Sequence, residues 1–246
     1  MPAAYDNYDY PSYWKDRKYE HNSEVYALRR FLERIPQIKS VLEIGAGYGR
    51  LTNEYEYRAN RVALTDPSAK LLKVARSTYK GKKYKFIQSS LERLDSKVRS
   101  RSYDLVIMIR VLHHIQDPEN SFKNVYKFLK PGGYFILEFP NKKNFKASMR
   151  EMAKGDVTYP INIFAKDMST KKSTLPFYNY HPDKIKHCIT SAGFKILSAR
   201  SVSNIRSRRI KKLVGEDTLL EIEKRIQIPL SHIDFGPSIF ILAQKK

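Results

Sequence analysis

Three glycines at alternate positions are the residues of this chain that most clearly indicate chemistry. Gly45, Gly47 and Gly49 follow a short apolar run, residues 41–44, in the segment VLEIGAGYGR. Glycine is needed where a backbone adopts a positive φ or approaches a ligand closely. The run before it is typical of a strand that is buried on both faces. The sequence therefore predicts a buried strand that leads into a loop against which a ligand can lie.

A carboxylate, Asp66, ends a second apolar run over residues 61–66. It follows the glycines at about the distance that separates such a loop from a ribose-binding acid. The glycine spacing is G-x-G-x-G, whereas loops that bind NAD-type pyrophosphates have G-x-G-x-x-G. A ligand that carries a ribose is therefore favoured, and an NAD-linked oxidoreductase is a weak alternative. For Asp66 itself, the alternative is an aspartate in an ordinary exposed turn.

The segment Glu43-x-Gly45-x-Gly47-x-Gly49, together with Asp66, resembles the class I, Rossmann-like methyltransferases that depend on S-adenosylmethionine (SAM). Within that class it is similar to the broad group that includes quinone and natural-product enzymes. The resemblance implies that SAM is the cofactor, that S-adenosylhomocysteine is the product, and that Asp66 accepts hydrogen bonds from both ribose hydroxyls. The cofactor-binding residues that it implies are Arg17, Glu43, Gly45, Ala46, Gly47, Gly49, Asp66, Pro67, Ser90, Leu91 and Arg110.

The end of a third expected strand, residues 84–88, departs from the family pattern. An acidic residue of the family often receives the adenine amine just after this strand, but here Ser90 stands in that place. A serine oxygen or a backbone carbonyl could accept the same hydrogen bond, and Leu91 could pack on the adenine ring. An ordinary turn serine is an equally good interpretation of Ser90.

Two histidines follow a fourth expected strand, residues 103–109, in the sequence IRVLHH. The resemblance implies that this segment, which includes Arg110, passes under the sulfonium and opens onto the acceptor. Methyl transfer from a sulfonium is a direct displacement, so alignment matters most and a base helps only a protonated acceptor. His113 or His114 could be that catalytic base near neutral pH. The alternative is a histidine that only holds the loop through its backbone.

Aromatic and basic side chains alternate in the opening segment, which we expect to form an arm over residues 1–37. Tyr8, Tyr13 and Trp14 lie close in sequence to Arg17. Similar leaders in the family fold over the cofactor as a lid, which would bring Arg17 to the methionine carboxylate and place Tyr13 and Trp14 against the substrate. A platform on which RNA bases stack, and an arm that only packs, are the alternatives.

Apolar runs alternate with helical patterns along most of the chain, which predicts an α/β fold with a parallel sheet. The resemblance implies a Rossmann-like, mostly parallel sheet of seven strands in the order 3-2-1-4-5-7-6, with the last strand antiparallel and helices on both faces. A helix capped by Asp117 precedes the fifth strand. The expected strands are residues 41–44, 62–65, 84–88, 103–109, 134–139, 194–203 and 238–243, and further expected helices are 23–35, 183–192 and a basic stretch over 205–225.

Residues 141–180 interrupt this alternation with a lysine-rich stretch that predicts neither a strand nor a long helix. We interpret the stretch as an insertion that covers the acceptor site. The segment ends in Phe177-Tyr178-Asn179-Tyr180-His181, and its aromatic side chains, chiefly Tyr178 and Tyr180 with the adjacent His181, could line the substrate pocket. Alternatively, these rings form a small core of the insertion itself.

Length and composition limit the class of protein further. A chain of 246 residues can form a single α/β domain, residues 1–246, and no run approaches 18 apolar residues, so no membrane span is expected. The opening residues lack the apolar region of a secretory signal, so we expect a cytoplasmic protein. The single cysteine, Cys188, has the helical spacing of a core residue, which leaves neither a cysteine nucleophile nor enough ligands for a metal site.

The net charge of +21 is the second informative feature. Basic residues cluster over 70–85, 142–172 and 206–212, and such a field attracts polyanions, although lysines that only confer solubility are an equal alternative. The preferred function is methylation of a small organic acceptor, with the arm and the insertion closing the pocket. The alternatives are an RNA methyltransferase that uses the basic surface and, less favoured, a SAM-binding protein without catalysis. The oligomeric state stays open.

Overall fold

The computed structural model describes residue 6 and residues 10–170 and 175–246. Within them, seven strands form one sheet in the order β3-β2-β1-β4-β5-β9-β8. Strands β1 to β5 pair in parallel, and β9 is antiparallel to both β5 and β8. With β8 and β9 counted as the sixth and seventh strands, the predicted order and the Rossmann-like α/β fold are confirmed. The strands are β1 (Ser40–Ile44), β2 (Arg61–Asp66), β3 (Tyr84–Gln88), β4 (Tyr103–Met108), β5 (Leu129–Pro140), β8 (Phe194–Val202) and β9 (Ser238–Lys245).

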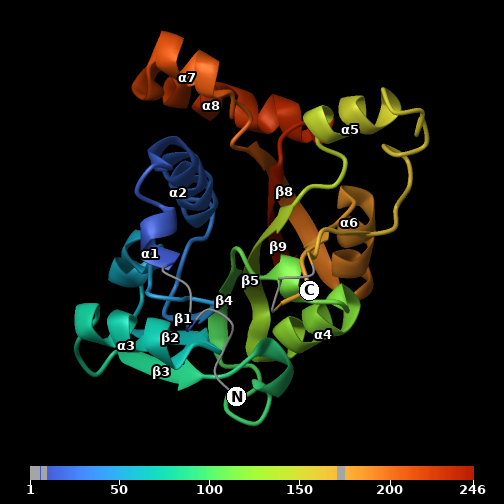
Figure 1. Ribbon diagram of the computed structural model, residues 1–246. Coiled ribbons are helices and arrows are strands. Elements are labelled where there is room, and N and C mark those ends of the chain that lie inside the picture. The colour runs from blue at the N-terminus through green and yellow to red at the C-terminus, as the bar shows by residue number, and fades with distance from the viewer. Residues whose placement is uncertain (1–5, 7–9, 171–174) are drawn as a thin grey trace.

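Helices cover both faces of the sheet (Figure 1). On one face, Leu28 of α2 and Ala75 of α3 share a core with Leu105 of β4; on the other, α4 and α6 pack on Val106 and its neighbours. Because successive residues of a buried strand point to opposite cores, the central strands are apolar throughout. The helices are α1 (Tyr10–Tyr13), α2 (Lys18–Leu32), α3 (Ala69–Thr78), α4 (Pro118–Phe128), α5 (Phe145–Met152), α6 (Pro182–Ser191), α7 (Arg208–Val214) and α8 (Glu216–Ser231).

Several boundaries differ from the prediction, each for a local reason. Helix α2 begins five residues before the predicted residue 23, at Lys18, because polar residues before the apolar face continue the same helix. Helix α4 is capped by Asp117 as predicted but ends at Phe128, so β5 already includes the Pro-Gly-Gly turn. The predicted basic stretch 205–225 is two helices, α7 and α8, because Gly215 between them has a φ of +80°.

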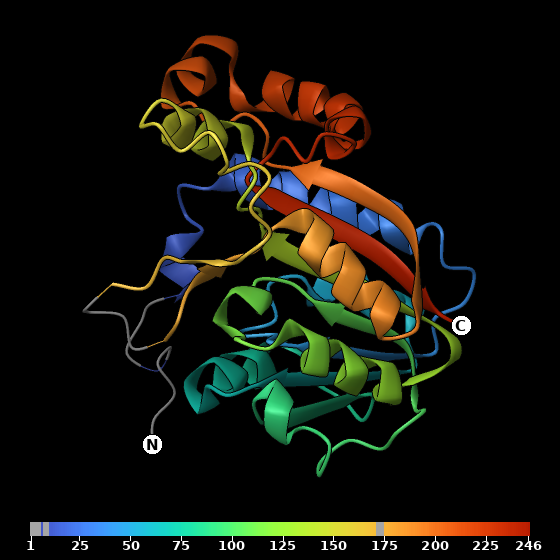
Figure 2. The same cartoon turned by 90° about the vertical axis from the view of Figure 1, so that its right-hand side faces the viewer.

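The segment 141–180 does leave the alternation of strands and helices. It contains the short helix α5 and a two-stranded sheet of β6 (Lys166–Asp167) and β7 (Tyr178–Asn179). In Figures 1 and 2, α5 and the chain that follows it lie at the same end of the molecule as α7, opposite α3 and β3. No helix of the described ranges is long and apolar enough to cross a membrane.

Candidate active site

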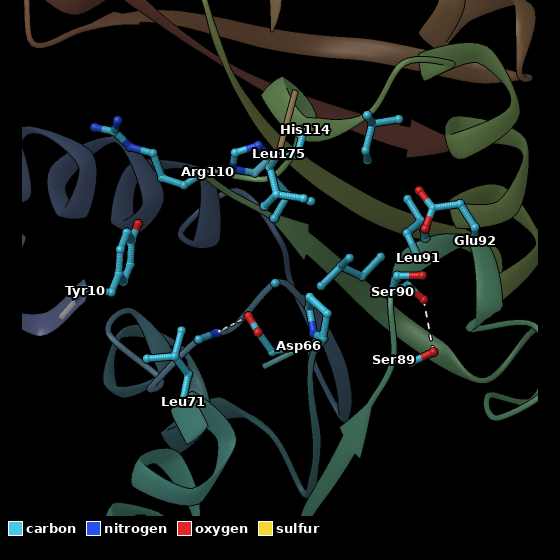
Figure 3. A pocket seen from close by; sticks show the side chains of 16 residues that line it. Tyr10, Asp66, Leu71, Ser89, Ser90, Leu91, Glu92, Arg110, His114 and Leu175 are labelled. Carbon is cyan, nitrogen blue, oxygen red and sulfur yellow. Dashed lines mark hydrogen bonds between the residues drawn. The ribbon is translucent and has the colours of Figure 1, made fainter. Parts of the chain in front are cut away.

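A cavity of about 310 Å³ lies where the carboxyl ends of β1, β2, β3 and β4 meet. This is the point at which strand order reverses, since β1 is flanked by β2 on one side and β4 on the other. We call it the first cavity, and Figure 3 shows its lining. Its walls are Tyr10, Ile44, Gly45, Gly47, Asp66, Pro67, Leu71, Ser89, Ser90, Leu91, Glu92, Arg110, Val111, His114, Ile115 and Leu175.

The glycine loop is shaped by packing and by backbone conformation. Gly45 has a φ of +71°, and a Cβ there would lie 2.2 Å from Cγ2 of Val111. A Cβ on Gly49 would lie 2.4 Å from Cε2 of Tyr79, on the side away from the cavity. Gly47 also has a positive φ, and only Leu71 is near its missing side chain. Of the three predicted glycines, Gly45 and Gly47 line the cavity, while Gly49 and Ala46 shape the turn behind it.

The carboxylate of Asp66 faces the first cavity and is held by two backbone amides. Gly47 N donates to Oδ2 at 2.9 Å, and Ser68 N donates to Oδ1 at 2.8 Å. Each oxygen keeps a further lone pair for a ligand. Burial raises the pKa of Asp66 to about 6, in spite of these two hydrogen bonds. The alternative of an exposed turn aspartate does not fit, because Asp66 is 6% exposed.

Glu43 precedes the loop but turns away from the cavity. Its carboxylate accepts hydrogen bonds from the hydroxyls of Thr52 and Tyr55 and is buried on the opposite side of β1. Burial raises the pKa of Glu43 to about 7. Its contacts fix the chain that follows the glycines, so its position supports the loop from behind.

The segment after β3 lines the first cavity as expected. Ser90 and Leu91 both contribute to the wall, and Leu91 is buried. The sequence interpretation missed Glu92, an exposed acid that lines the same wall two residues after Ser90. The sequence signal that could have identified Glu92 is an acidic residue two positions after Ser90, where the family often has an acid. Leu71 was missed as well; it lies in α3, one turn after the Ser68 cap.

A second cavity of about 240 Å³ adjoins the first, since Tyr10 and Arg110 line both. Its remaining lining comes from α1, His113, the end of β5 and the chain before β7. Four of its seven side chains are aromatic or imidazole rings. Its lining residues are Tyr10, Tyr13, Arg110, His113, Glu138, Pro140 and Phe177.

The rings of the two histidines are in contact at a tilted angle, and they differ in their other contacts. Their ring centroids are 3.9 Å apart, and the ring of Phe177 lies 4.6 Å from that of His113. Nδ1 of His114 lies 2.8 Å from the carbonyl oxygen of Pro176, whereas Nδ1 of buried His113 has no hydrogen-bond partner among the described atoms. Burial, with the nearby His114 and Arg110, lowers the pKa of His113 well below its usual value, and burial lowers that of His114. Both shifts favour the neutral imidazole.

A buried carboxylate, Glu24 of α2, connects the arm to both cavities. Its two oxygens accept hydrogen bonds from Arg110 and from Arg50, which ends the glycine loop. Burial opposes ionisation, but the two guanidinium groups hold the pKa of Glu24 below its usual value. The guanidinium of Arg50 lies 3.7 Å from the Trp14 ring centroid. Arg110 has a φ of +63°, and its N–H donates to Glu138 at 2.8 Å.

Besides Glu43, Ala46 and Gly49, five predicted site residues line neither cavity. Trp14 is buried between the guanidinium groups of Arg50 and Arg110, and Arg17 lies over the ring of Tyr13 at 4.2 Å. These contacts make the arm a packed element around Tyr13, which does line the second cavity. Tyr8 is outside the described residues.

The other three, Tyr178, Tyr180 and His181, serve the insertion. The Tyr180 hydroxyl donates to the carbonyl of Ile115, and His181 caps α6 while its Nε2 lies 3.0 Å from the carbonyl oxygen of Pro160. Tyr178 packs against the core below Tyr180. Phe177, one residue earlier, is the ring that reaches the second cavity.

Comparisons with known proteins agree with this geometry. Residues 42–137 match the family described as "Methyltransferase domain". A "tRNA 5-carboxymethoxyuridine methyltransferase" of Escherichia coli (strain K12) is 27% identical over 225 residues, 88% of this chain and 84% of that protein. A "Ubiquinone biosynthesis O-methyltransferase" of Vibrio atlanticus (strain LGP32) is 30% identical over 147 residues, 56% of this chain and 61% of that protein.

Solved structures show the same fold. A SAM-dependent methyltransferase from Mesorhizobium loti superposes with a TM-score of 0.65 at 19% identity, over 91% of this chain and 98% of that one. An N-methyltransferase from Bradyrhizobium japonicum WM9, solved with S-adenosylhomocysteine, has a TM-score of 0.62 at 13% identity, over 98% and 94% of the two chains. Residues 42–137 are therefore a methyltransferase domain, and the chain has the fold of the class I, SAM-dependent methyltransferases. Its cofactor is therefore SAM, and the resemblance inferred from the glycine loop is confirmed.

Proposed function

We propose that the chain transfers the methyl group of SAM to a small organic acceptor, with the cofactor in the first cavity and the acceptor in the second. The observation that carries this proposal is that the cavities adjoin through Tyr10 and Arg110. A direct displacement needs the two reactants side by side and aligned, which two adjoining cavities provide.

The first cavity fits the cofactor in its donors and its shape. The remaining lone pairs of the Asp66 carboxylate suit the two ribose hydroxyls, and the bare backbone of the glycine loop allows close approach. Leu91 offers an apolar wall for the adenine, with Ser90 and Glu92 as acceptors for its amine. When bound, SAM supplies a methyl group on a positively charged sulfur.

Arg110 is a better candidate than Arg17 for the methionine carboxylate. Arg110 lines the first cavity, whereas the guanidinium of Arg17 lies over Tyr13. Its charge is secure, because the facing Glu24 raises the pKa of Arg110 even against burial. Glu24 holds one edge of the guanidinium and so fixes its orientation. We propose that Arg110 orients the cofactor, and that Arg17 keeps Tyr13 in place.

On the acceptor side, His113 is the residue proposed to take the proton. Its Nδ1 is buried without a partner, and the ring lines the second cavity. A neutral imidazole can accept a proton from an acceptor hydroxyl as the methyl group arrives. Glu138 lines the same cavity, but its carboxylate accepts hydrogen bonds from Arg110 N and the Ser238 hydroxyl. Tyr13 and Phe177 would hold an apolar or aromatic acceptor.

The test is the transfer of labelled methyl from SAM into a cell extract that is then separated into small-molecule, RNA and protein fractions. Label in the small-molecule fraction, lost in His113→Ala but retained in His187→Ala, is the expected result. His187 is the matched control because it lies on the outer part of α6, near Ser191. Label confined to protein, or an unchanged rate in His113→Ala, would overturn the acceptor or the base, respectively.

RNA is the second candidate acceptor, and two observations favour it. The net charge is +21, and the tRNA methyltransferase relative aligns along nearly the whole chain. RNA affinity that falls steeply with salt and depends on a particular RNA would support this acceptor, because phosphate contacts release counterions. Weak binding that any RNA competes for would indicate only nonspecific attraction, and the absence of label in RNA would exclude it.

A further inference from the structure

Most of the large apolar side chains that the described residues expose come from α5, the chain after it, and α7. On α5, Phe145, Met149 and Met152 are 53%, 51% and 40% exposed, at a spacing that puts them on one face of the helix. On α7, Leu213 is 85% exposed and Ile210 lies one turn before it. A helix normally turns such a face inward. We call these two helices and residues 153–168 the apolar-basic face.

The loop that follows α5, residues 153–168, exposes several large apolar side chains. Val157, Ile161 and Phe164 are 68%, 74% and 77% exposed. The backbone that carries them is nevertheless firmly held, because Nζ of buried Lys142 donates to the carbonyls of Asn162 and Phe164, both at 2.7 Å. Burying a lysine is costly, and here it fixes a loop whose large apolar groups face solvent. We therefore interpret this exposed apolar surface as a contact surface.

Tyr159 also holds the backbone of this loop in place. Its ring is buried in the middle of the loop, and the ammonium groups of Lys142 and Lys166 lie 5.2 and 4.9 Å from its centroid. The ring of His181, at the cap of α6, is hydrogen bonded to the carbonyl of Pro160. The loop is therefore tied to the core at three points, while its apolar side chains point outward.

Positive charge is interleaved with these apolar groups. The five basic residues between positions 206 and 212 have no acidic residue among them, and α5 carries exposed lysine and arginine between its apolar positions. Exposed basic residues of the face are Lys146, Arg150, Lys154, Arg209 and Lys212, of which Arg150 and Lys154 pair with Glu151. Apolar groups that enter an acyl region, together with cations at headgroup level, are the pattern of a surface that binds anionic bilayers.

The other occupants of such a face fit less well. RNA bases stack on aromatic rings and phosphates pair with cations, but the aliphatic Val157, Ile161 and Leu213 would gain little from either. A protein interface buries an apolar core from which lysine is depleted, whereas lysines here alternate with the apolar groups. Figures 1 and 2 both show α5, the start of the chain that follows it, and α7 at the same end of the molecule.

The face also reaches the acceptor cavity. Phe177 is 36% exposed and lines the second cavity, and its carbonyl accepts a hydrogen bond from Met168 N at 2.7 Å. Met168, at the end of the loop, is itself exposed. An apolar acceptor that leaves a bilayer would therefore meet Phe177 at the cavity.

We propose that the apolar-basic face docks on a membrane surface rich in anionic lipid, and that the acceptor is an apolar molecule drawn from that membrane. The identity of the acceptor rests on the proposed function, whereas docking does not. Docking can be measured without any methyl transfer, so the failure of one proposal is distinguishable from the failure of the other.

The experiment is sedimentation of the full chain with vesicles of phosphatidylglycerol and phosphatidylcholine, compared with vesicles of phosphatidylcholine alone, at physiological salt. We expect binding to the anionic vesicles and about tenfold or greater loss in the variant Ile161→Ser, Phe164→Ser, Leu213→Ser. The matched control is Tyr57→Ser with Val74→Ser, which removes exposed apolar groups near β3 and on α3. Calorimetric binding of S-adenosylhomocysteine by each variant shows that it is folded.

A charge pair separates specific docking from the general basicity of the chain. Arg209→Glu with Lys212→Glu should weaken vesicle binding, and Lys80→Glu with Lys82→Glu, the same charge change near α3, should not. Docking is overturned if the wild type stays in solution, if both charge pairs lose binding equally, or if the apolar variant binds as the wild type does. It is also overturned if the apolar variant instead loses self-association or RNA binding.

Discussion

The two cavities differ in what builds them. The first is formed mainly by short loops at the ends of neighbouring parallel strands, which the sheet itself places together. The second also takes Arg110 and His113 from the segment after β4, but the rest of its lining comes from the arm, the end of β5 and the chain before β7, which are distant in sequence. The proposed cofactor site thus follows from the fold, whereas the proposed acceptor site also depends on the arm and the insertion, which the fold does not specify. Variants should therefore affect the two cavities separately, except where one group supports both.

Glu24 is such a shared group, and its removal should have the largest effect. Glu24→Ala leaves two largely buried arginines without their carboxylate, which should lower the free energy of unfolding by about 3–5 kcal/mol. Urea denaturation measures the change. The control Glu33→Ala removes a carboxylate from an exposed pair with Arg30 and should cost less than about 1 kcal/mol. If Glu24→Ala and Glu33→Ala lowered the free energy of unfolding equally, Glu24 would not be the group that supports both cavities.

Asp66 should affect the first cavity alone. Asp66→Ala removes the carboxylate proposed to accept two ribose hydroxyls, so affinity for S-adenosylhomocysteine should fall about 100-fold. Calorimetry measures it. Asp167→Ala, which removes an exposed aspartate of β6 whose carboxylate accepts a hydrogen bond from Ser169 N, should leave the affinity unchanged. An unchanged affinity in Asp66→Ala would refute the ribose assignment.

Phe177 should affect the second cavity alone. Phe177→Ala enlarges the proposed acceptor site, so kcat/KM for the acceptor should fall about 20-fold while affinity for S-adenosylhomocysteine stays within about twofold. Steady-state kinetics with the labelled acceptor and calorimetry give the two values. Phe86→Ala, on β3 away from both cavities, is the control for a lost aromatic ring. A parallel fall in cofactor affinity would mean that the cavities are not separate.

The pH dependence of cofactor binding should report on Asp66, with a smaller effect. Its folded pKa of about 6 lies above the unfolded value, so protonation between pH 7 and pH 5 should weaken binding about tenfold. Protonation of Asp66 has the opposite effect on stability. Because the folded state binds this proton more tightly than the unfolded state, the free energy of unfolding should rise as the pH falls through 6. Both quantities are measured at several pH values in the wild type and in Asp66→Asn. In the variant, neither the affinity for S-adenosylhomocysteine nor the free energy of unfolding should show this dependence on pH.

The predictable parts of the molecule are those that depend on local sequence. Asp66 and the glycine loop could be located because a strand end and its turn are adjacent in sequence. Glu24 could not, because a charged residue in a helix is usually exposed, and it is buried here only by Arg50 and Arg110 from distant loops. The aromatic segment that includes Phe177 was predicted to line the acceptor site, but Tyr178 and Tyr180 were preferred within it, because the path of the insertion decides which ring reaches the cavity.

The order of the strands came from the family resemblance, because alternating patterns predict a parallel sheet without fixing its order. Glu43 illustrates the remaining limit. Its position beside the glycines was predictable, but its direction was not, because alternation along β1 puts it on the side of Thr52 and Tyr55.

The division between the cavities is tested most directly by titrating S-adenosylhomocysteine into the wild type, Asp66→Ala and Phe177→Ala by calorimetry. We expect the wild type and Phe177→Ala to bind with similar affinity and Asp66→Ala to bind about 100-fold more weakly. Failure of the wild type to bind, or an equal loss in both variants, would contradict the assignment of the cofactor to the first cavity and the acceptor to the second.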